Sequence, residues 1–150
     1  MSSITVVPDP FTLVPYDVAE ITALVEEAAA LAEIPPGVDI RLTVDEELFA
    51  PLTGHMSDVV DGRIEAWVSG GNFEDNKRPC HFSADQARID LAVIMLRAKD
   101  RLSDEFAAAP RDSELSRGER VAWDTYAFGR ALRLGLRVRR PRELYDFRLQ

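Results

Sequence analysis

Three stretches of the chain repeat apolar residues at intervals of three and four positions, which predicts three amphipathic helices. The first begins at Asp17 and Glu20, whose spacing is that of a capping box, and stops before residues 35–37, which read Pro-Pro-Gly. The second covers residues 84–102, behind a second capping box that starts at Ser83. Its apolar stripe is wide, so we expect it to be the central packing helix. The stripe consists of Ala87, Leu91, Ile94, Met95, Ala98 and Leu102.

The third helix has equally clear end signals. Ser116 and Glu119 form a third capping box, and the helix is expected to run to about Leu134, where Gly135 provides the C-terminal stop. Two runs beyond this helix alternate between apolar and polar residues and predict late strands. These runs are residues 136–139 and 145–149.

Alternation with a period of two predicts the remaining strands. Residues 38–44 alternate strictly and should form a half-buried strand. The pair Asp61-Gly62 separates Val59-Val60 from residues 63–68, which is a strong signal for a β-hairpin whose second strand should cover residues 63–68. The sheet residues expected beneath the second helix are Ile40, Leu42 and Val68.

These elements predict a single α+β domain over residues 1–150, with a small, mostly antiparallel sheet and three main helices packed on it. Strands and helices do not alternate regularly, which argues against a parallel doubly wound sheet. Residues 1–16 contain three prolines and should form an extended lead-in. Residues 72–82 should form a polar loop.

Charge is divided unevenly between the two halves of the chain. Residues 1–75 contain fifteen acidic and two basic residues, a net charge of −13, whereas residues 76–150 contain eleven acidic and sixteen basic residues, a net charge of +5. Such asymmetry indicates recognition of a partner or of a second copy more than catalysis. The overall charge of −8 argues against a general nucleic-acid binder, since phosphate binding needs a positive surface.

The single cysteine and the N-terminal sequence bear on the cellular compartment. Cys80 is the only cysteine, so no internal disulfide can form. The N-terminus lacks the basic start and long apolar run of a secretory signal, and no stretch contains the ~18 apolar residues that cross a bilayer. We therefore expect a soluble cytoplasmic protein with no membrane partner.

His55, Cys80 and His81 are the candidates for metal binding or nucleophilic catalysis. Zinc sites usually space Cys and His as in C-x₂-C or H-E-x-x-H, and neither pattern occurs. The acidic turns at residues 45–47 and 74–75 carry oxygen ligands without an EF-hand pattern, which favours solvated turns. The sequence therefore assigns no catalytic, cofactor-binding or metal-binding residue and implies no cofactor.

A cluster of arginines lies near the C-terminal end of the sequence. It consists of Arg130, Arg133, Arg137, Arg139, Arg140 and Arg142. Such a cluster could contact nucleic acid. Neutralisation of the acidic half of the same fold is the interpretation that we favour.

The order of helix, alternating strand, edge hairpin and long central helix over residues 17–102 resembles minimal zincin-like metallopeptidase domains. In that superfamily the central helix carries H-E-x-x-H, whereas residues 87–94 of this chain contain neither His nor Glu. The resemblance implies a zincin-like scaffold without a zinc site and carries over no functional residue.

Three hypotheses of function remain open. The favoured one is a non-enzymatic domain that binds a protein partner or associates with itself. The first alternative is a small metal-dependent hydrolase that uses His55, Cys80 or His81 with nearby carboxylates. The second is a nucleic-acid accessory protein that uses the C-terminal arginines.

Overall fold

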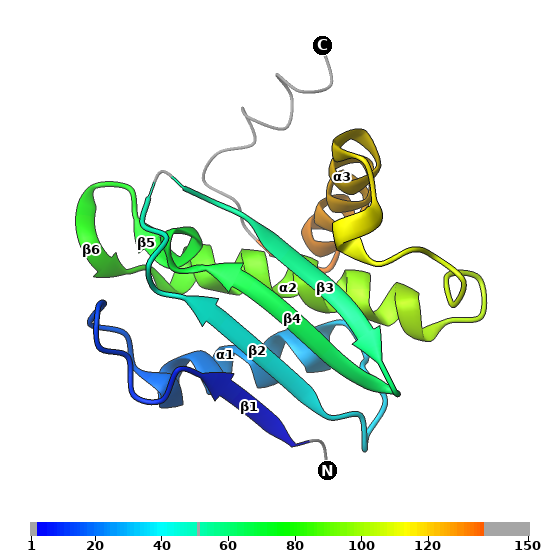
Figure 1. Ribbon diagram of the computed structural model, residues 1–150, viewed down its shortest axis with the longest axis horizontal. Coiled ribbons are helices and arrows are strands. Elements are labelled where there is room, and N and C mark those ends of the chain that lie inside the picture. The colour runs from blue at the N-terminus through cyan, green and yellow to red at the C-terminus, as the bar shows by residue number, and fades with distance from the viewer. Residues whose placement is uncertain (1–2, 51, 137–150) are drawn as a thin grey trace.

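The computed structural model describes residues 3–50 and 52–136 and confirms the α+β class (Figure 1). The main sheet consists of β1 (Ile4–Val7), β2 (Ile40–Asp45), β3 (His55–Val60) and β4 (Arg63–Ser69). The helices are α1 (Val18–Leu31), α2 (Ala84–Leu102) and α3 (Arg117–Arg133), with the 3₁₀ turns η1 (Gly70–Phe73) and η2 (Asp112–Glu114). A separate two-stranded sheet is formed by β5 (Glu74–Asp75) and β6 (Arg78–Phe82).

The main sheet is mixed, which corrects the expected mostly antiparallel arrangement. Its strand order is β1-β2-β4-β3, and the β1–β2 and β2–β4 pairs are both parallel. Only the predicted hairpin, β3 with β4, is antiparallel. A parallel pair needs a crossover connection, and α1 provides it between β1 and β2. The N-terminal lead-in, which its prolines led us to expect as merely extended, thus contains the edge strand β1.

The polar loop expected over residues 72–82 is also corrected, because this segment contains β5 and β6. The hairpin turn matches its sequence signal: Asp61 and Gly62 both have positive φ values, 52° and 76°, as a type I′ turn requires. The expected strand over residues 145–149, and residues 137–139 of the other late strand, lie outside the described residues.

The helices form a second layer on one face of the sheet. In Figure 1, α1 and α2 lie behind the strands, and α3 packs against α2. The predicted stripe of α2 is buried except at its end: Leu91, Ile94, Met95 and Ala98 are each 0% exposed, and Leu102 is partly buried. They join Ile40, Leu42 and Val68 in one hydrophobic core, as the sequence predicted.

Side-chain caps position the two later helices. The Ser83 hydroxyl accepts a hydrogen bond from the Gln86 N–H, and Ser116 and Glu119 form the complete capping box that begins α3. The third helix ends at Arg133, and Gly135 adopts the left-handed conformation with φ 99°. Among the described residues, no helix is both long enough and apolar enough to cross a membrane.

Candidate functional site

His55 lies at the start of β3 and binds the third helix. Its Nε2 is 2.9 Å from Oδ1 of Asp124 on α3, and the two side chains are 17% and 27% exposed. The same Oδ1 accepts a hydrogen bond of 3.0 Å from the Arg97 guanidinium on α2. His55 therefore belongs to a polar junction of β3, α2 and α3 that the sequence did not reveal.

Asp90 on α2 lies within electrostatic range of this junction. Burial raises the pKa of its carboxyl to about 6, partly opposed by His55 and by hydrogen bonds from Gln86 and Asn72, while Asp124 adds to the rise. Gln86 lies one turn earlier on α2, and its Nε2 is 3.3 Å and 3.4 Å from the two carboxylate oxygens. A carboxyl with this pKa changes protonation near neutral pH, as a general acid or base would.

A buried ionic cluster continues from the junction along α2. The guanidinium of Arg97 binds the carboxylate of Asp112, and both side chains are fully buried. Arg101, one turn further along α2, donates to the same carboxylate at 2.6 Å. The backbone N–H of Ser57 donates to its other oxygen at 2.8 Å. The cluster holds the segment around η2 against β3 and α2, so its role is to anchor the fold.

Trp123 on α3 covers both arginines of this cluster. The guanidinium carbons of Arg97 and Arg101 lie 4.8 Å and 4.7 Å from the centroid of its ring, which is a cation–π arrangement. The indole N–H donates to Asp100 at 2.8 Å. Arg97 and Arg101 are spaced i, i+4 and follow Ile94 and Ala98 of the apolar stripe by three residues each, and this spacing was the available sequence signal for buried arginines.

The structure places Cys80 and His81 on β6, where both are exposed. Nδ1 of His81 is 3.1 Å from the Pro79 carbonyl oxygen, whereas His55 binds Asp124. Within residues 3–50 and 52–136, no group of three or more His, Cys, Asp and Glu side chains is arranged to hold a metal ion. The structure therefore does not bring the three predicted candidates together as a metal site.

The acidic turn after β2 has a structural use. Glu46 accepts hydrogen bonds from the backbone N–H groups of Thr12 and Leu13 at 3.0 Å and 2.9 Å. These bonds, with that from Leu13 the strongest cause, lower the pKa of Glu46. Asp45 accepts from the N–H of Glu47 within the same turn. The turn thus ties the N-terminal segment to the end of β2.

The arginine cluster is only partly described. Arg130 donates to both carboxylate oxygens of Asp100 at 2.7 Å and 2.9 Å, and to the Leu96 carbonyl at 3.1 Å. It is therefore neutralised by α2 and not by the acidic N-terminal half. Arg137, Arg139, Arg140 and Arg142 lie outside the described residues.

The face of the sheet opposite α1 and α2 carries a continuous row of four side chains, one from each strand. Ile40, Leu42, Ile64 and Ala66 point toward the helices and are buried, so the alternate residues point away. Strand register aligns one such residue from each strand: Val7 with Thr43, Thr43 with Trp67, and Trp67 with Met56. All four residues of this row are partly exposed. We call them the open-face row.

The other half of this face is polar. Arg41 and Glu65 are paired in register beside the open-face row, and Arg63 lies 3.7 Å from Glu65. A shallow hollow of about 140 Å³ opens here between these side chains and the start of β1. Figure 1 shows this helix-free face from the front. It combines the open-face row, in which Val7, Trp67 and Met56 are apolar, with a half that carries both signs of charge.

No family model, curated protein or solved structure matches the chain. The resemblance to zincin-like domains therefore stays a prediction that rests on the order of the elements.

Proposed function

We propose that this protein is a non-enzymatic self-association domain in which two copies pack the helix-free faces of their sheets together. The observation that carries the proposal is the open-face row, in which Trp67 lies between Thr43 and Met56 on a face that no described helix covers. Aromatic residues and methionine are enriched in protein interfaces, and sheets pack face to face with interdigitated side chains.

A second copy fits this face better than a partner of one charge. The polar half carries Arg41 and Arg63 together with Glu65, so the same surface supplies both members of an ion pair. An interface with two-fold symmetry brings one surface patch against its own copy, which requires this self-complementarity. The candidate catalytic residues give less support to the hydrolase hypothesis, because His55 is bound to Asp124 in the junction with α3.

Sedimentation velocity of the 150-residue protein over a wide concentration range tests the proposal. We expect a concentration-dependent dimer, and we expect Trp67→Lys to weaken it by at least about a factor of ten, since a desolvated aromatic anchor typically contributes more than 1 kcal/mol. The matched control is Tyr126→Lys, which changes an exposed aromatic residue on α3 in the same way. Circular dichroism establishes that both variants are folded.

A monomer at every concentration would overturn the proposal, as would equal dissociation by Trp67→Lys and Tyr126→Lys. The salt dependence of association distinguishes this proposal from association through the C-terminal arginines. Raising the ionic strength from 0.01 M to 1 M shortens the Debye length from about 30 Å to about 3 Å. Association through the open-face row should persist under this change, whereas association led by arginines should be lost.

A further inference from the structure

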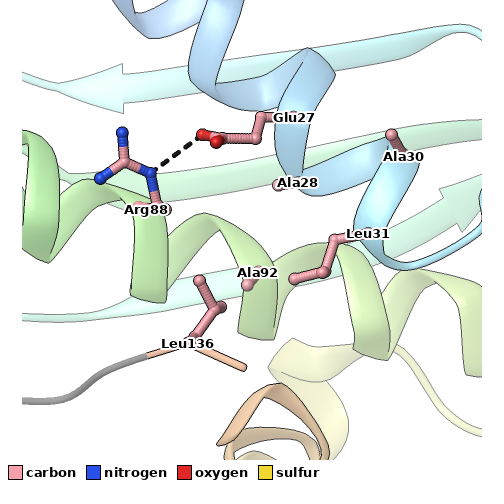
Figure 2. Close-up of a pocket in the computed structure, with 7 residues that line it drawn as sticks. All are labelled: Glu27, Ala28, Ala30, Leu31, Arg88, Ala92 and Leu136. Carbon is pink, nitrogen blue, oxygen red and sulfur yellow. Dashed lines mark hydrogen bonds and ion pairs between the residues drawn. The ribbon is translucent and has the colours of Figure 1, made fainter. Parts of the chain in front are cut away.

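Several arginines in the helical layer are neutralised within the chain. A groove of about 330 Å³ lies between α1 and α2, and at one end of it the Arg88 Nε contacts a carboxylate oxygen of Glu27 at 3.0 Å (Figure 2). Arg97 and Arg130 likewise bind carboxylates of their own chain. These ion pairs satisfy their charges without a second copy.

The polar half of the helix-free face differs, because its charges are incompletely paired. Arg41 is exposed, and among the described residues no hydrogen bond or ion pair engages its guanidinium. Arg63 lies 3.7 Å from Glu65, and an exposed pair at this separation contributes little. Asp39 lines the same hollow, and its Oδ1 accepts a hydrogen bond of 3.1 Å from the Ser3 N–H. Two arginines and two carboxylates on this face are thus available to bind a second copy.

These four charged residues are arranged symmetrically about the middle of the sheet. The strand order β1-β2-β4-β3 places the midline between β2 and β4. Strand register pairs Arg41 on β2 with Glu65 on β4, directly across this line. Asp39 precedes β2 and lies across the line from Arg63, since its carbonyl oxygen accepts the Ile64 N–H at 2.9 Å. At each of these two levels of the sheet, an arginine on one side of the midline therefore lies opposite a carboxylate on the other side.

A half-turn about this midline brings unlike charges together. When the axis runs along the strands, in the plane between two facing sheets, each residue keeps its level and the two sides of the sheet are exchanged. Strand β2 of one copy then faces β4 of the other, so Arg41 faces Glu65 and Arg63 faces Asp39 in both directions, as an isologous interface requires. An axis across the strands at the level of Arg41 would instead set Arg41 against Arg41 and Glu65 against Glu65.

The open-face row fits the same half-turn. Its register order is Val7, Thr43, Trp67 and Met56, so Thr43 of one copy faces Trp67 of the other, and Val7 faces Met56. Facing sheets interdigitate well when small side chains meet large ones, as Thr43 and Trp67 do. Packed sheets cross at about 30°, so this opposition is closest along the midline, where Thr43 and Trp67 lie.

We propose that two copies associate about a two-fold axis along the midline between β2 and β4, with Arg41 of each copy bound to Glu65 of the other and Arg63 of each bound to Asp39 of the other. This inference rests on the proposed self-association through the open-face row and specifies its orientation. Apolar burial in the row supplies most of the affinity, whereas the charge pairs fix how the two sheets face each other.

Exchange of charge between copies tests this orientation. Arg41→Glu sets two carboxylates opposite each other in both halves of its homodimer, and Glu65→Arg does the same with two guanidinium groups. We expect each variant alone to associate at least about tenfold more weakly than wild type, because like charges oppose binding. An equimolar mixture restores both pairs, so the heterodimer should bind within about threefold of wild type. Sedimentation velocity measures the affinities, and native mass spectrometry identifies the heterodimer.

Asp39→Arg is the matched control for Glu65→Arg. It makes the same change from acid to arginine on the same face and close to Arg41, but in the proposed orientation it faces Arg63. A mixture of Arg41→Glu with Asp39→Arg should therefore bind at least about tenfold more weakly than the mixture with Glu65→Arg. The variant that should restore association of Asp39→Arg is Arg63→Glu. Circular dichroism establishes that each variant is folded.

Equal rescue of Arg41→Glu by Glu65→Arg and by Asp39→Arg would overturn the proposed orientation, because it would indicate attraction between opposite net charges without fixed pairs. No rescue by Glu65→Arg would also overturn it, as would an Arg41→Glu variant that dimerises like wild type. In either of these cases, loss of the dimer in Trp67→Lys would still support self-association through the open-face row. A wild-type protein that is monomeric at every concentration would overturn both proposals.

Discussion

The guanidinium of Arg97 binds the carboxylate of Asp112 at a point where neither side chain is exposed to solvent. Removing one partner of a buried pair leaves an uncompensated charge and typically costs about 3–5 kcal/mol. We therefore expect Asp112→Ala to lower the free energy of unfolding by that amount in urea denaturation. Asp112→Asn keeps an acceptor for the Ser57 N–H but not the charge, so it should recover only part of the loss.

An exposed pair provides the contrast for this prediction. Glu65→Gln removes the carboxylate that lies 3.7 Å from Arg63, where both side chains are about a third or more exposed. Exposed pairs contribute about 0–1 kcal/mol. A loss for Asp112→Ala no larger than that for Glu65→Gln would contradict the anchoring role of the buried cluster.

Asp90 should make stability depend on pH in a direction opposite to most carboxylates. Its pKa is raised from 3.8 to about 6. Between these values the folded protein retains a proton that the unfolded chain has lost, so stability falls as pH rises through this window. Asp90→Asn cannot ionise. Relative to wild type, the variant should therefore gain up to about 3 kcal/mol between pH 4 and pH 7.

Urea denaturation of both proteins at several pH values checks this. The matched control is Asp104→Asn, which makes the same chemical change at an exposed position after α2. If the difference between Asp90→Asn and wild type does not change over this pH range, the burial of Asp90 is wrongly assigned.

Gly71 should not tolerate a side chain. A Cβ at this position would lie 2.5 Å from the Leu52 carbonyl oxygen and 2.6 Å from the Ala50 nitrogen, and both of these atoms belong to the backbone. Gly71→Ala should therefore cost at least about 2 kcal/mol in denaturation experiments. Gly129→Ala on α3, where the nearest atom is a side-chain nitrogen at 3.7 Å, should instead stabilise by about 0.5–1 kcal/mol. Two variants of equal stability would refute the close approach at Gly71.

Leu91 tests the assignment of the central helix. Its side chain is fully buried in the core, so Leu91→Ala should lower the free energy of unfolding by about 2–5 kcal/mol. Leu132→Ala removes the same atoms from a side chain on α3 that is 40% exposed, and it should cost much less. A loss below about 1 kcal/mol for Leu91→Ala would mean that the buried face is assigned wrongly.

Removal of metal should leave stability unchanged. The described residues contain no grouping of three metal-ligating side chains, and His55 is bound to Asp124. We expect EDTA to leave Tm unchanged and elemental analysis to find no stoichiometric zinc, because a structural zinc contributes directly to folding energy. One zinc per chain that is lost in His55→Ala would favour the hydrolase hypothesis over self-association.

Local patterns in the sequence determined the helices and the hairpin of this protein. Helix α2 begins and ends where the capping Ser83 and the apolar stripe predict, because its signals act within one or two turns. The Asp61-Gly62 turn is equally local, since two residues with positive φ fix the hairpin by themselves. The same patterns identified Leu91 and Ile40 as core residues.

Only the tertiary structure decided how these elements pair and which polar side chains meet. The parallel pairing of β1 with β2 joins residues separated by α1, and nothing in the sequence of the lead-in specifies its partner strand. Arg97, Asp112 and Asp124 likewise come from α2, η2 and α3 and meet because the helices pack in one particular way. Capping and periodicity depend on near neighbours, whereas strand pairing and buried charge clusters depend on contacts distant in sequence, and a single sequence records these only weakly.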